Sequence, residues 1–269
     1  MSNLALRALS ALIILPLLGA LVLWHQPLGF GALVVLVAAL ALVEYAAITL
    51  PAASPRFRAL VVAVGAGFTA ALYLVPGQAL VWGLAALMAT ATLVLVSPGD
   101  IPAAGARLGL ATFGVFYIGG LAAPLAILQR DAPRGRAWVL LAVAVTFGND
   151  AGAYFAGRSL GRHKLYPAVS PAKTVEGGVG GMAAALLIMF VARATLCPWL
   201  TVGDCLLVAL PASVLGPIGD LVESLIKRSA GVKDSGHLIP GHGGMLDRID
   251  ALLFVAAWTY LYVVHLKNK

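Results

Sequence analysis

The chain has 269 residues, of which 61% are hydrophobic and 11% charged, and its mean hydropathy is +0.97. Soluble domains average about 45–50% apolar and about 25% charged residues, so this composition excludes a soluble globular protein and a disordered chain. The formal net charge of +7 would suggest nucleic-acid binding in a soluble protein, but in a membrane protein it reflects basic loops and anionic lipid headgroups. The composition predicts an all-α polytopic integral membrane protein that does not bind nucleic acid.

About nine apolar stretches are long enough to cross a bilayer core of about 30 Å, which takes about 20 helical residues. These stretches are residues 8–24, 28–50, 59–75, 79–96, 108–128, 137–157, 177–196, 200–219 and 251–266. The first of them follows Arg7 but lacks a small-x-small cleavage site, so we interpret it as a retained helix and not as a signal peptide. The simplest organisation is a single integral membrane domain over residues 1–269, in which residues 1–136 form mainly apolar helices and residues 251–266 form the final helix.

The basic residues predict the orientation of these helices. If successive spans alternate in direction, the side that holds the N-terminus carries twelve of the 18 Lys and Arg residues. The positive-inside rule then makes the N-terminus cytoplasmic and the C-terminus periplasmic. A short polytopic chain without a targeting extension is typical of a bacterial inner membrane.

Ionisable residues gather in two segments, residues 147–177 and 219–250, both on the predicted cytoplasmic side. Seven of the eleven acidic residues lie there. Residues 1–99 contain a single acidic residue, Glu44, which we expect to pair within the helix bundle. A membrane protein that concentrates its ionisable residues in this way does its chemistry in those segments.

The first polar segment ends the sixth span and leads into the seventh. Asp150, Tyr154 and Arg158 are spaced i, i+4 and i+8, which puts them on one helix face. An alternative reading of Asp150 is a polar residue satisfied inside the bundle. A Ser-Pro turn, a lysine and a threonine before a Gly-rich helix start indicate an anion cradle at a helix N-terminus. Its candidate phosphate-binding residues are Ser170, Lys173 and Thr174.

The second polar segment begins with a stripe of polar side chains on a predicted helix. The stripe follows the i, i+3, i+4, i+7, i+8 spacing and consists of Asp220, Glu223, Ser224, Lys227 and Arg228. Lys233 and a Gly-His-Gly-Gly run that contains His242 come next. Asp247, Arg248 and Asp250 then open the final span, and the two aspartates share a helix face.

These residue types are suited to phosphate chemistry. Carboxylates on two helices can hold Mg²⁺ through hard oxygen atoms, and glycines allow a backbone to approach an anion closely. Lys and Arg side chains can neutralise phosphoryl charge. In the alternative reading, charges beside a membrane span only set topology or are solvated, and His242 is a turn residue. That alternative is weakest for Asp220 and Asp247, because acidic groups contribute little to topology.

The run from Ser224 to Asp250 closely resembles the phosphatidate cytidylyltransferase family, also called CDP-diacylglycerol synthases. It matches as Ser-Leu-Ile-Lys-Arg, four residues, Lys-Asp, and then Pro-Gly-His-Gly-Gly-Met-Leu-Asp-Arg-Ile-Asp, with every spacing intact. Residues 147–177 are similar to the same family, in which Asp-Thr-x-Ala-Tyr precedes Ser-Pro-x-Lys-Thr-x-Glu-Gly. Two departures are Ala151, where the family usually has Thr, and Val175, where Trp is frequent.

The resemblance implies a nucleotidyltransferase that moves the cytidylyl group of CTP to phosphatidate in the bilayer, giving CDP-diacylglycerol and pyrophosphate for phospholipid biosynthesis. Residues 137–250 would form its catalytic region, with a cytoplasm-facing site. It implies Mg²⁺ as cofactor and leaves open a second metal, a monovalent cation and a homodimer. A related enzyme for an ether or isoprenoid lipid phosphate stays open, and so does a multi-span transporter, although only Glu44 and Asp150 suit one. A CDP-alcohol phosphotransferase is disfavoured, because its Asp-Gly-x-x-Ala-Arg stretch is absent from the sequence.

The roles expected of individual residues follow from this resemblance together with their chemistry. Asp220 and Asp247 are expected to bind the metal, with Asp250 or Asp150 as a further or water-mediated ligand. The expected catalytic residues are Asp220, Asp247, Lys227, Arg228 and His242. The expected substrate- and phosphate-binding residues are Ser170, Lys173, Thr174, Lys233, Arg248, Ser224 and Tyr154.

Overall fold

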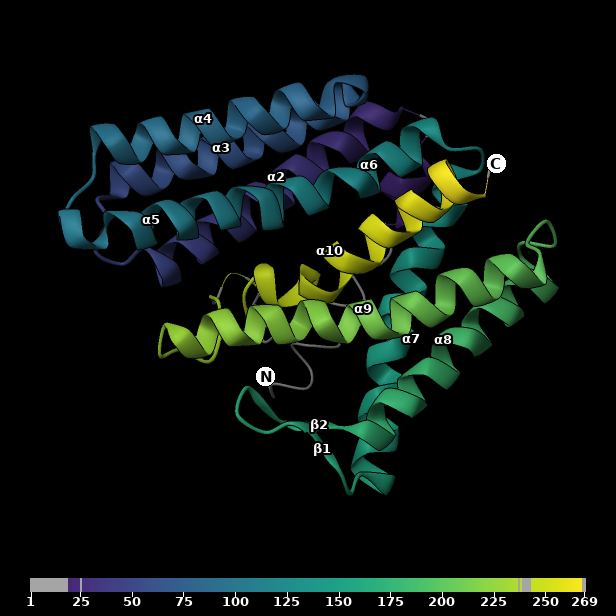
Figure 1. Cartoon of the computed structure of the whole chain (residues 1–269). Coiled ribbons are helices and arrows are strands. Elements are labelled where there is room, and N and C mark those ends of the chain that lie inside the picture. Colours follow the sequence, from purple (N-terminus) through teal and green to yellow (C-terminus); the bar gives the residue numbers. More distant parts are fainter. Residues whose placement is uncertain (1–18, 25, 237, 239–242, 268–269) are drawn as a thin grey trace. The chain divides into compact units, whose positions relative to one another are not determined.

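The computed structural model describes residues 19–24, 26–236, 238 and 243–267, and eight helices in these ranges are long and apolar enough to cross a membrane (Figure 1). They confirm the last eight predicted spans, while most of the predicted span 8–24 lies outside the described residues. The protein is therefore an all-α polytopic membrane protein. The chain divides into two compact units, Met1–Ile127 with Ser229–Arg248 and Leu128–Arg228 with Ile249–Lys269. The single domain expected from the sequence stays a prediction.

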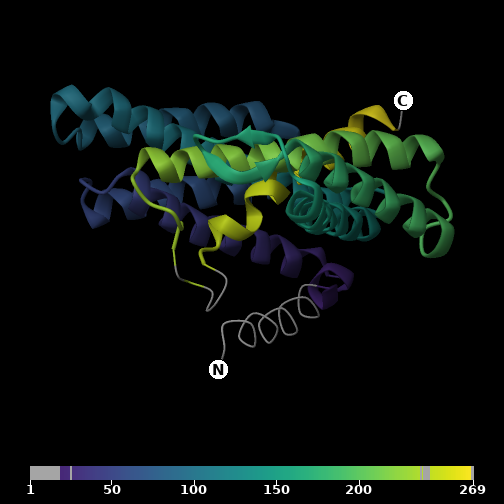
Figure 2. The ribbon, with the colours of Figure 1, turned by 90° about the horizontal axis from the view of Figure 1, so that it is seen from below.

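The first unit consists mainly of long apolar helices. They are α2 (Pro27–Thr49), α3 (Pro55–Leu74), the 3-10 turn η1 (Pro76–Gln78), α4 (Ala79–Val96), α5 (Ile101–Gly114), the π-helical η2 (Val115–Gly120) and α6 (Leu121–Asp131), which continues into the second unit. Helices α2 to α5 lie side by side (Figures 1 and 2). Helix α3 begins where the Ser54 hydroxyl accepts a hydrogen bond from the Phe57 amide, the usual arrangement at a helix N-terminus.

Small residues allow the helices of the first unit to approach closely. A Cβ atom placed on Gly119 would lie 2.7 Å from the carbonyl oxygen of Gly65, so η2 and α3 touch through their backbones. The Thr69 hydroxyl lies 3.0 and 2.9 Å from the carbonyl oxygens of the same two glycines. Close backbone contact and a hydroxyl between helices are typical of packing inside a membrane.

The second unit contains most of the polar residues singled out in the sequence. Its elements are α7 (Gly135–Leu160), β1 (Lys164–Tyr166), β2 (Ser170–Thr174), α8 (Val175–Thr195), α9 (Val202–Ser229), the larger part of α10 (Leu246–Leu261) and the π-helical η3 (Tyr262–Leu266). Helices α7 and α8 pack through glycines, since a Cβ on Gly152 would lie 2.6 Å from that of Ala184. Helix α9 runs ten residues past the predicted end at Gly219, so the polar stripe lies on a helix as expected.

A short hairpin connects α7 to α8 and corrects one expectation. The sequence suggested a Ser-Pro turn at Ser170, but Ser170–Thr174 is a strand paired antiparallel with β1, with Tyr166 opposite Ser170 and Lys164 opposite Thr174. Strand pairing between two such short segments, one of which contains Pro171, has no periodic signal in the sequence. The strand ends where the Thr174 hydroxyl accepts a hydrogen bond from the Gly177 amide at 3.1 Å and caps α8.

A buried carboxylate, Asp204, stabilises another part of the second unit. It accepts hydrogen bonds from the Tyr262 hydroxyl and the Lys267 ammonium group, both at 2.6 Å, and from the backbone amide of Thr201 at 2.7 Å. These donors offset the cost of burying the charge, so we interpret Asp204 as a structural residue.

Candidate metal and phosphate site

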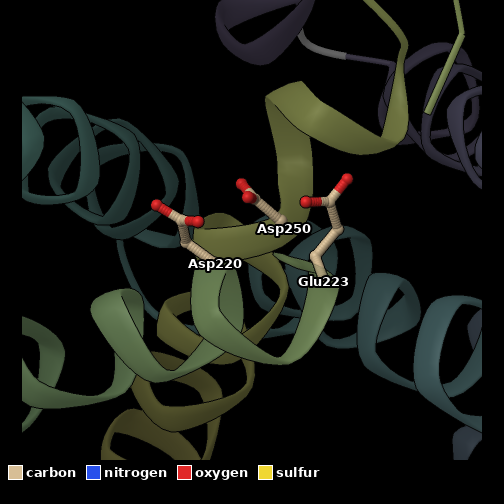
Figure 3. Close-up of side chains that lie close together, drawn as sticks. All are labelled: Asp220, Glu223 and Asp250. Atoms are coloured by element: carbon tan, nitrogen blue, oxygen red, sulfur yellow. The ribbon is translucent and has the colours of Figure 1, made fainter. Parts of the chain in front are cut away.

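Three carboxylates from two helices meet in the second unit (Figure 3). One oxygen atom from each of Asp220, Glu223 and Asp250 lies within 4.8 Å of the other two. Asp220 and Glu223 stand one turn apart on α9, and Asp250 reaches them from α10. Among the described residues, no other set of three His, Cys, Asp or Glu side chains gathers as closely. The arrangement offers a cation oxygen ligands from two separate helices.

Two lysines offset part of the negative charge of the three carboxylates Asp220, Glu223 and Asp250 (the acidic group). The Lys173 ammonium nitrogen lies 2.8 Å from Oδ2 of Asp220, and that of Lys227 lies 2.5 Å from Oε2 of Glu223. Two carboxylate charges about 4–5 Å apart repel by about 3–4 kcal/mol at an effective dielectric near 20, so nearby ammonium groups are needed to offset this repulsion. Three carboxylates and two ammonium groups still leave a net negative charge. The excess of carboxylates over ammonium groups allows the cluster to bind a cation.

Asp220 is held by a hydroxyl on its own helix and by a lysine from the hairpin. Its Oδ1 accepts a hydrogen bond from the Ser224 hydroxyl at 3.1 Å, one turn further along α9. Lys173 reaches α9 from strand β2 and also donates to the carbonyl oxygen of Pro217, at 3.3 Å. The hairpin therefore places an ammonium group directly beside the Asp220 carboxylate.

Helix α7 carries three further predicted residues. Asp150, Tyr154 and Arg158 lie on one helix as expected, and Nη1 of Arg158 donates to the Tyr154 hydroxyl at 2.9 Å. All three are exposed, so the alternative of an Asp150 buried inside the bundle is wrong. Asp150 lies within electrostatic range of Asp250 but outside the close acidic group. Its role as a more distant ligand stays a prediction.

The remaining predicted phosphate-binding residues of this unit differ in how accessible they are. Ser170 is half-buried at the start of β2, whereas Thr174 is buried and already serves as the cap of α8. Lys227 is bound to the acidic group, and Arg228 is exposed in the last turn of α9. Their contacts with a phosphate stay predictions.

Asp247, in the first unit, is held by hydrogen bonds from its own segment of the chain. Its Oδ2 accepts hydrogen bonds from the amide of Ser235 at 3.1 Å, the Ser235 hydroxyl at 3.0 Å and the amide of Gly244 at 2.9 Å. Lys233 and Arg248 are exposed, and His242 lies outside the described residues. Because Asp247 and Asp220 belong to different units, their expected sharing of one metal stays a prediction.

Sequence reasoning missed two carboxylates. Glu223 was placed on the polar stripe of Asp220 but given no metal role, although its i+3 spacing is a usable signal. Glu44 was expected only to pair within the helix bundle. In the structure it is buried and bonded to the segment around Asp247.

The chain belongs to the cytidylyltransferase family, whose model matches residues 5–266. It is similar to the phosphatidate cytidylyltransferase of Bacillus subtilis, with 41% identity over 154 residues, which are 57% of each chain. The enzyme of the same name from Brucella suis is 45% identical over 152 residues, 55% of each chain. That from Staphylococcus haemolyticus is 46% identical over 125 residues, which are 45% of this chain and 46% of the relative. The chain thus spans about half the length of these relatives.

Proposed function

We propose that the protein transfers the cytidylyl group of CTP to phosphatidate, giving CDP-diacylglycerol and pyrophosphate. The observation that carries the proposal is the acidic group of Asp220, Glu223 and Asp250, held between Lys173 and Lys227. It lies in the part of the chain whose motifs resemble phosphatidate cytidylyltransferases. Family membership and the names of the relatives support the same reaction.

The acidic group has the chemistry of an Mg²⁺ site, since Mg²⁺ prefers carboxylate oxygens. We infer that Asp220, Glu223 and Asp250 hold the ion, with Asp247 or Asp150 as further ligands. A bound Mg²⁺ would neutralise charge on the triphosphate and on the transferring phosphoryl group. A second metal or a monovalent cation is compatible with the same residues.

The reaction joins two anionic phosphates, so cationic side chains have to offset their repulsion. Lys173 and Lys227 are already placed beside the carboxylates, and Arg228, Lys233 and Arg248 are exposed cations near the ends of α9 and α10. We propose that these five groups, with Ser170, Thr174, Ser224 and Tyr154 as hydrogen-bonding partners, bind the triphosphate and the lipid headgroup. His242 would help to position a phosphate.

The chemical step needs no covalent intermediate on the protein. A phosphatidate oxygen attacks the α-phosphorus of CTP in line, the new P–O bond forms, and the bond to the β-phosphate bridging oxygen breaks. Pyrophosphate leaves with that electron pair. A phosphate monoester is ionised at pH 7, so the attacking oxygen requires no strong general base. The residues of the site therefore act by binding, orienting and neutralising charge.

The location follows from the substrates. Phosphatidate stays in the bilayer while CTP is soluble, so the polar site has to lie at a membrane surface. The distribution of basic residues supports a cytoplasmic site in a bacterial inner membrane, with the N-terminus inside. A homodimer is compatible with this arrangement.

The proposal is tested with purified protein in detergent, radiolabelled CTP and a panel of lipid phosphates. We expect equal amounts of CDP-diacylglycerol and pyrophosphate from phosphatidate, and no turnover after Mg²⁺ is removed with EDTA until Mg²⁺ is restored. Absence of product from phosphatidate, or preference for an ether or isoprenoid lipid phosphate, would overturn the substrate assignment.

A further inference from the structure

Glu44 is a buried carboxylate on an otherwise apolar helix, and its partners lie about 200 residues away in the sequence. Glu44 is 9% exposed and lies within helix α2. Oε1 accepts a hydrogen bond from the amide of Met245 at 2.9 Å, and Oε2 accepts one from the amide of Leu246, also at 2.9 Å. These two amides lie at the start of α10. The first backbone amides of a helix have no hydrogen-bond acceptor within the helix itself. The carboxylate therefore supplies acceptors where the positive end of the helix dipole favours a negative charge.

Ser235 connects this carboxylate to Asp247. Its hydroxyl oxygen lies 2.9 Å from Oε2 of Glu44 and 3.0 Å from Oδ2 of Asp247. A hydroxyl has one proton to donate, so it can satisfy only one of these oxygens at a time. The positions of the two carboxylates thus depend on each other through one side chain.

Two glycines, Gly236 and Gly244, lie directly against the Glu44 carboxylate. A Cβ on Gly236 would lie 2.7 Å from Oε1 of Glu44. A Cβ on Gly244 would collide with the Ser235 hydroxyl and with Oε2 of Glu44. A larger residue at either position would have to displace the Glu44 carboxylate or the backbone beside it, so the present contacts depend on glycine at both positions.

We propose that Glu44 is a positioning residue for cytidylyl transfer: it anchors Ser235 and residues 244–247 on helix α2 and sets the orientation of Asp247. The inference rests on the proposed function, because Asp247 belongs to the motif that carries the resemblance. It gives the apolar N-terminal part of the chain a role in positioning Asp247, although no residue of that part was expected to contribute. Glu44 itself touches no reacting atom in this account.

The test compares Glu44→Gln with Glu44→Asp and with a control, Asp204→Asn, which also removes a buried, bonded carboxylate but in the other unit. Glutamine keeps the shape and loses one acceptor oxygen. We expect Glu44→Gln to lower kcat by about tenfold to 100-fold and to raise the Mg²⁺ concentration needed for half-maximal rate, because displaced catalytic groups cost factors of this size. Glu44→Asp should recover part of the rate. Asp204→Asn should lower the unfolding temperature and leave the Mg²⁺ requirement unchanged.

A second readout needs no activity. Hydrogen–deuterium exchange of the amides of Met245 and Leu246 should accelerate in Glu44→Gln and stay at the wild-type rate in Asp204→Asn. Wild-type protein that makes no CDP-diacylglycerol would refute the proposed function, and the exchange experiment would still report on the anchor. Unchanged kcat and Mg²⁺ requirement in a folded Glu44→Gln protein, or unchanged exchange, would overturn the positioning role.

Discussion

Two clusters of carboxylates, one in each unit, differ in what neutralises them. Asp220 and Glu223 are paired with the ammonium groups of Lys173 and Lys227, at the ends of long, flexible side chains. Glu44 and Asp247 accept instead from backbone amides and from the Ser235 hydroxyl. Amides in a folded backbone stay in place, whereas a lysine can move to a substrate phosphate.

This difference separates two tasks. Lysine-paired carboxylates can exchange an ammonium partner for a metal ion, and the lysine released is then available for a phosphate. Carboxylates bonded to backbone amides define the conformation of a segment. We therefore expect substitutions in the acidic group to act on metal-dependent catalysis and substitutions around Glu44 to act through the position of the segment.

The largest effect is expected from the acidic group itself. Asp220→Asn and Asp250→Asn should each lower kcat by at least about 100-fold, because each removes a charged oxygen ligand from the site where charge develops. The measurement is CDP-diacylglycerol formation from CTP and phosphatidate. Asp100→Asn is the matched control, since Asp100 is exposed and its side chain caps no helix. Activity of Asp250→Asn close to that of the control would refute the site.

Asp247 gives the next test, because it is a predicted metal ligand and also accepts hydrogen bonds from Ser235 and Gly244. Asp247→Asn is expected to reduce turnover by about tenfold to 100-fold, as either role would require. Activity within a few-fold of wild type would rule out Asp247 as a metal ligand. Exchange of the Gly244 amide, which donates to Asp247, reports the effect on the segment separately.

Lys173 tests whether the hairpin contributes to catalysis. Lys173→Ala removes the ammonium group beside Asp220, and we expect kcat to fall by about tenfold, the size of a lost charge-assisted contact. Lys164→Ala, an exposed lysine on the adjacent strand, is the control and should behave as wild type. If the two variants were equally active, Lys173 would be a structural residue only.

The smallest effect is expected at the cap of α8. Thr174→Ala should lower the free energy of unfolding by about 1 kcal/mol, the usual cost of a lost N-cap, while Thr174→Ser keeps the acceptor oxygen. Unfolding of the two variants in the same detergent measures the difference. Equal stability would show that the bond to Gly177 contributes little.

Much of the fold was predictable because hydrophobic length is a local property. The eight described spans follow from apolar runs, and the polar stripe on α9 follows from its helical spacing. The β1–β2 hairpin was missed, because its strands are short and carry no alternation of apolar and polar residues. The extension of α9 past Gly219 reflects the ability of a polar stripe to continue a helix beyond its apolar part.

The site was predictable only where motif and spacing coincide. Asp220 and Asp250 were expected as ligands, and the structure brings them together with Glu223, whose one-turn spacing from Asp220 was noted without a metal role. The bond between Glu44 and Leu246 joins residues 202 positions apart. Nothing local in the sequence encodes such a contact, because it depends on how α2 packs against a distant segment.

Binding of a divalent cation by Asp220, Glu223 and Asp250 is the central claim, and titration with Mn²⁺, followed by electron paramagnetic resonance on detergent-purified protein, tests it most directly. We predict that wild type and Asp100→Asn bind Mn²⁺ with equal affinity, that excess Mg²⁺ displaces it, and that Asp250→Asn loses the binding. An Asp250→Asn protein that is folded and binds Mn²⁺ as tightly as wild type would contradict the account.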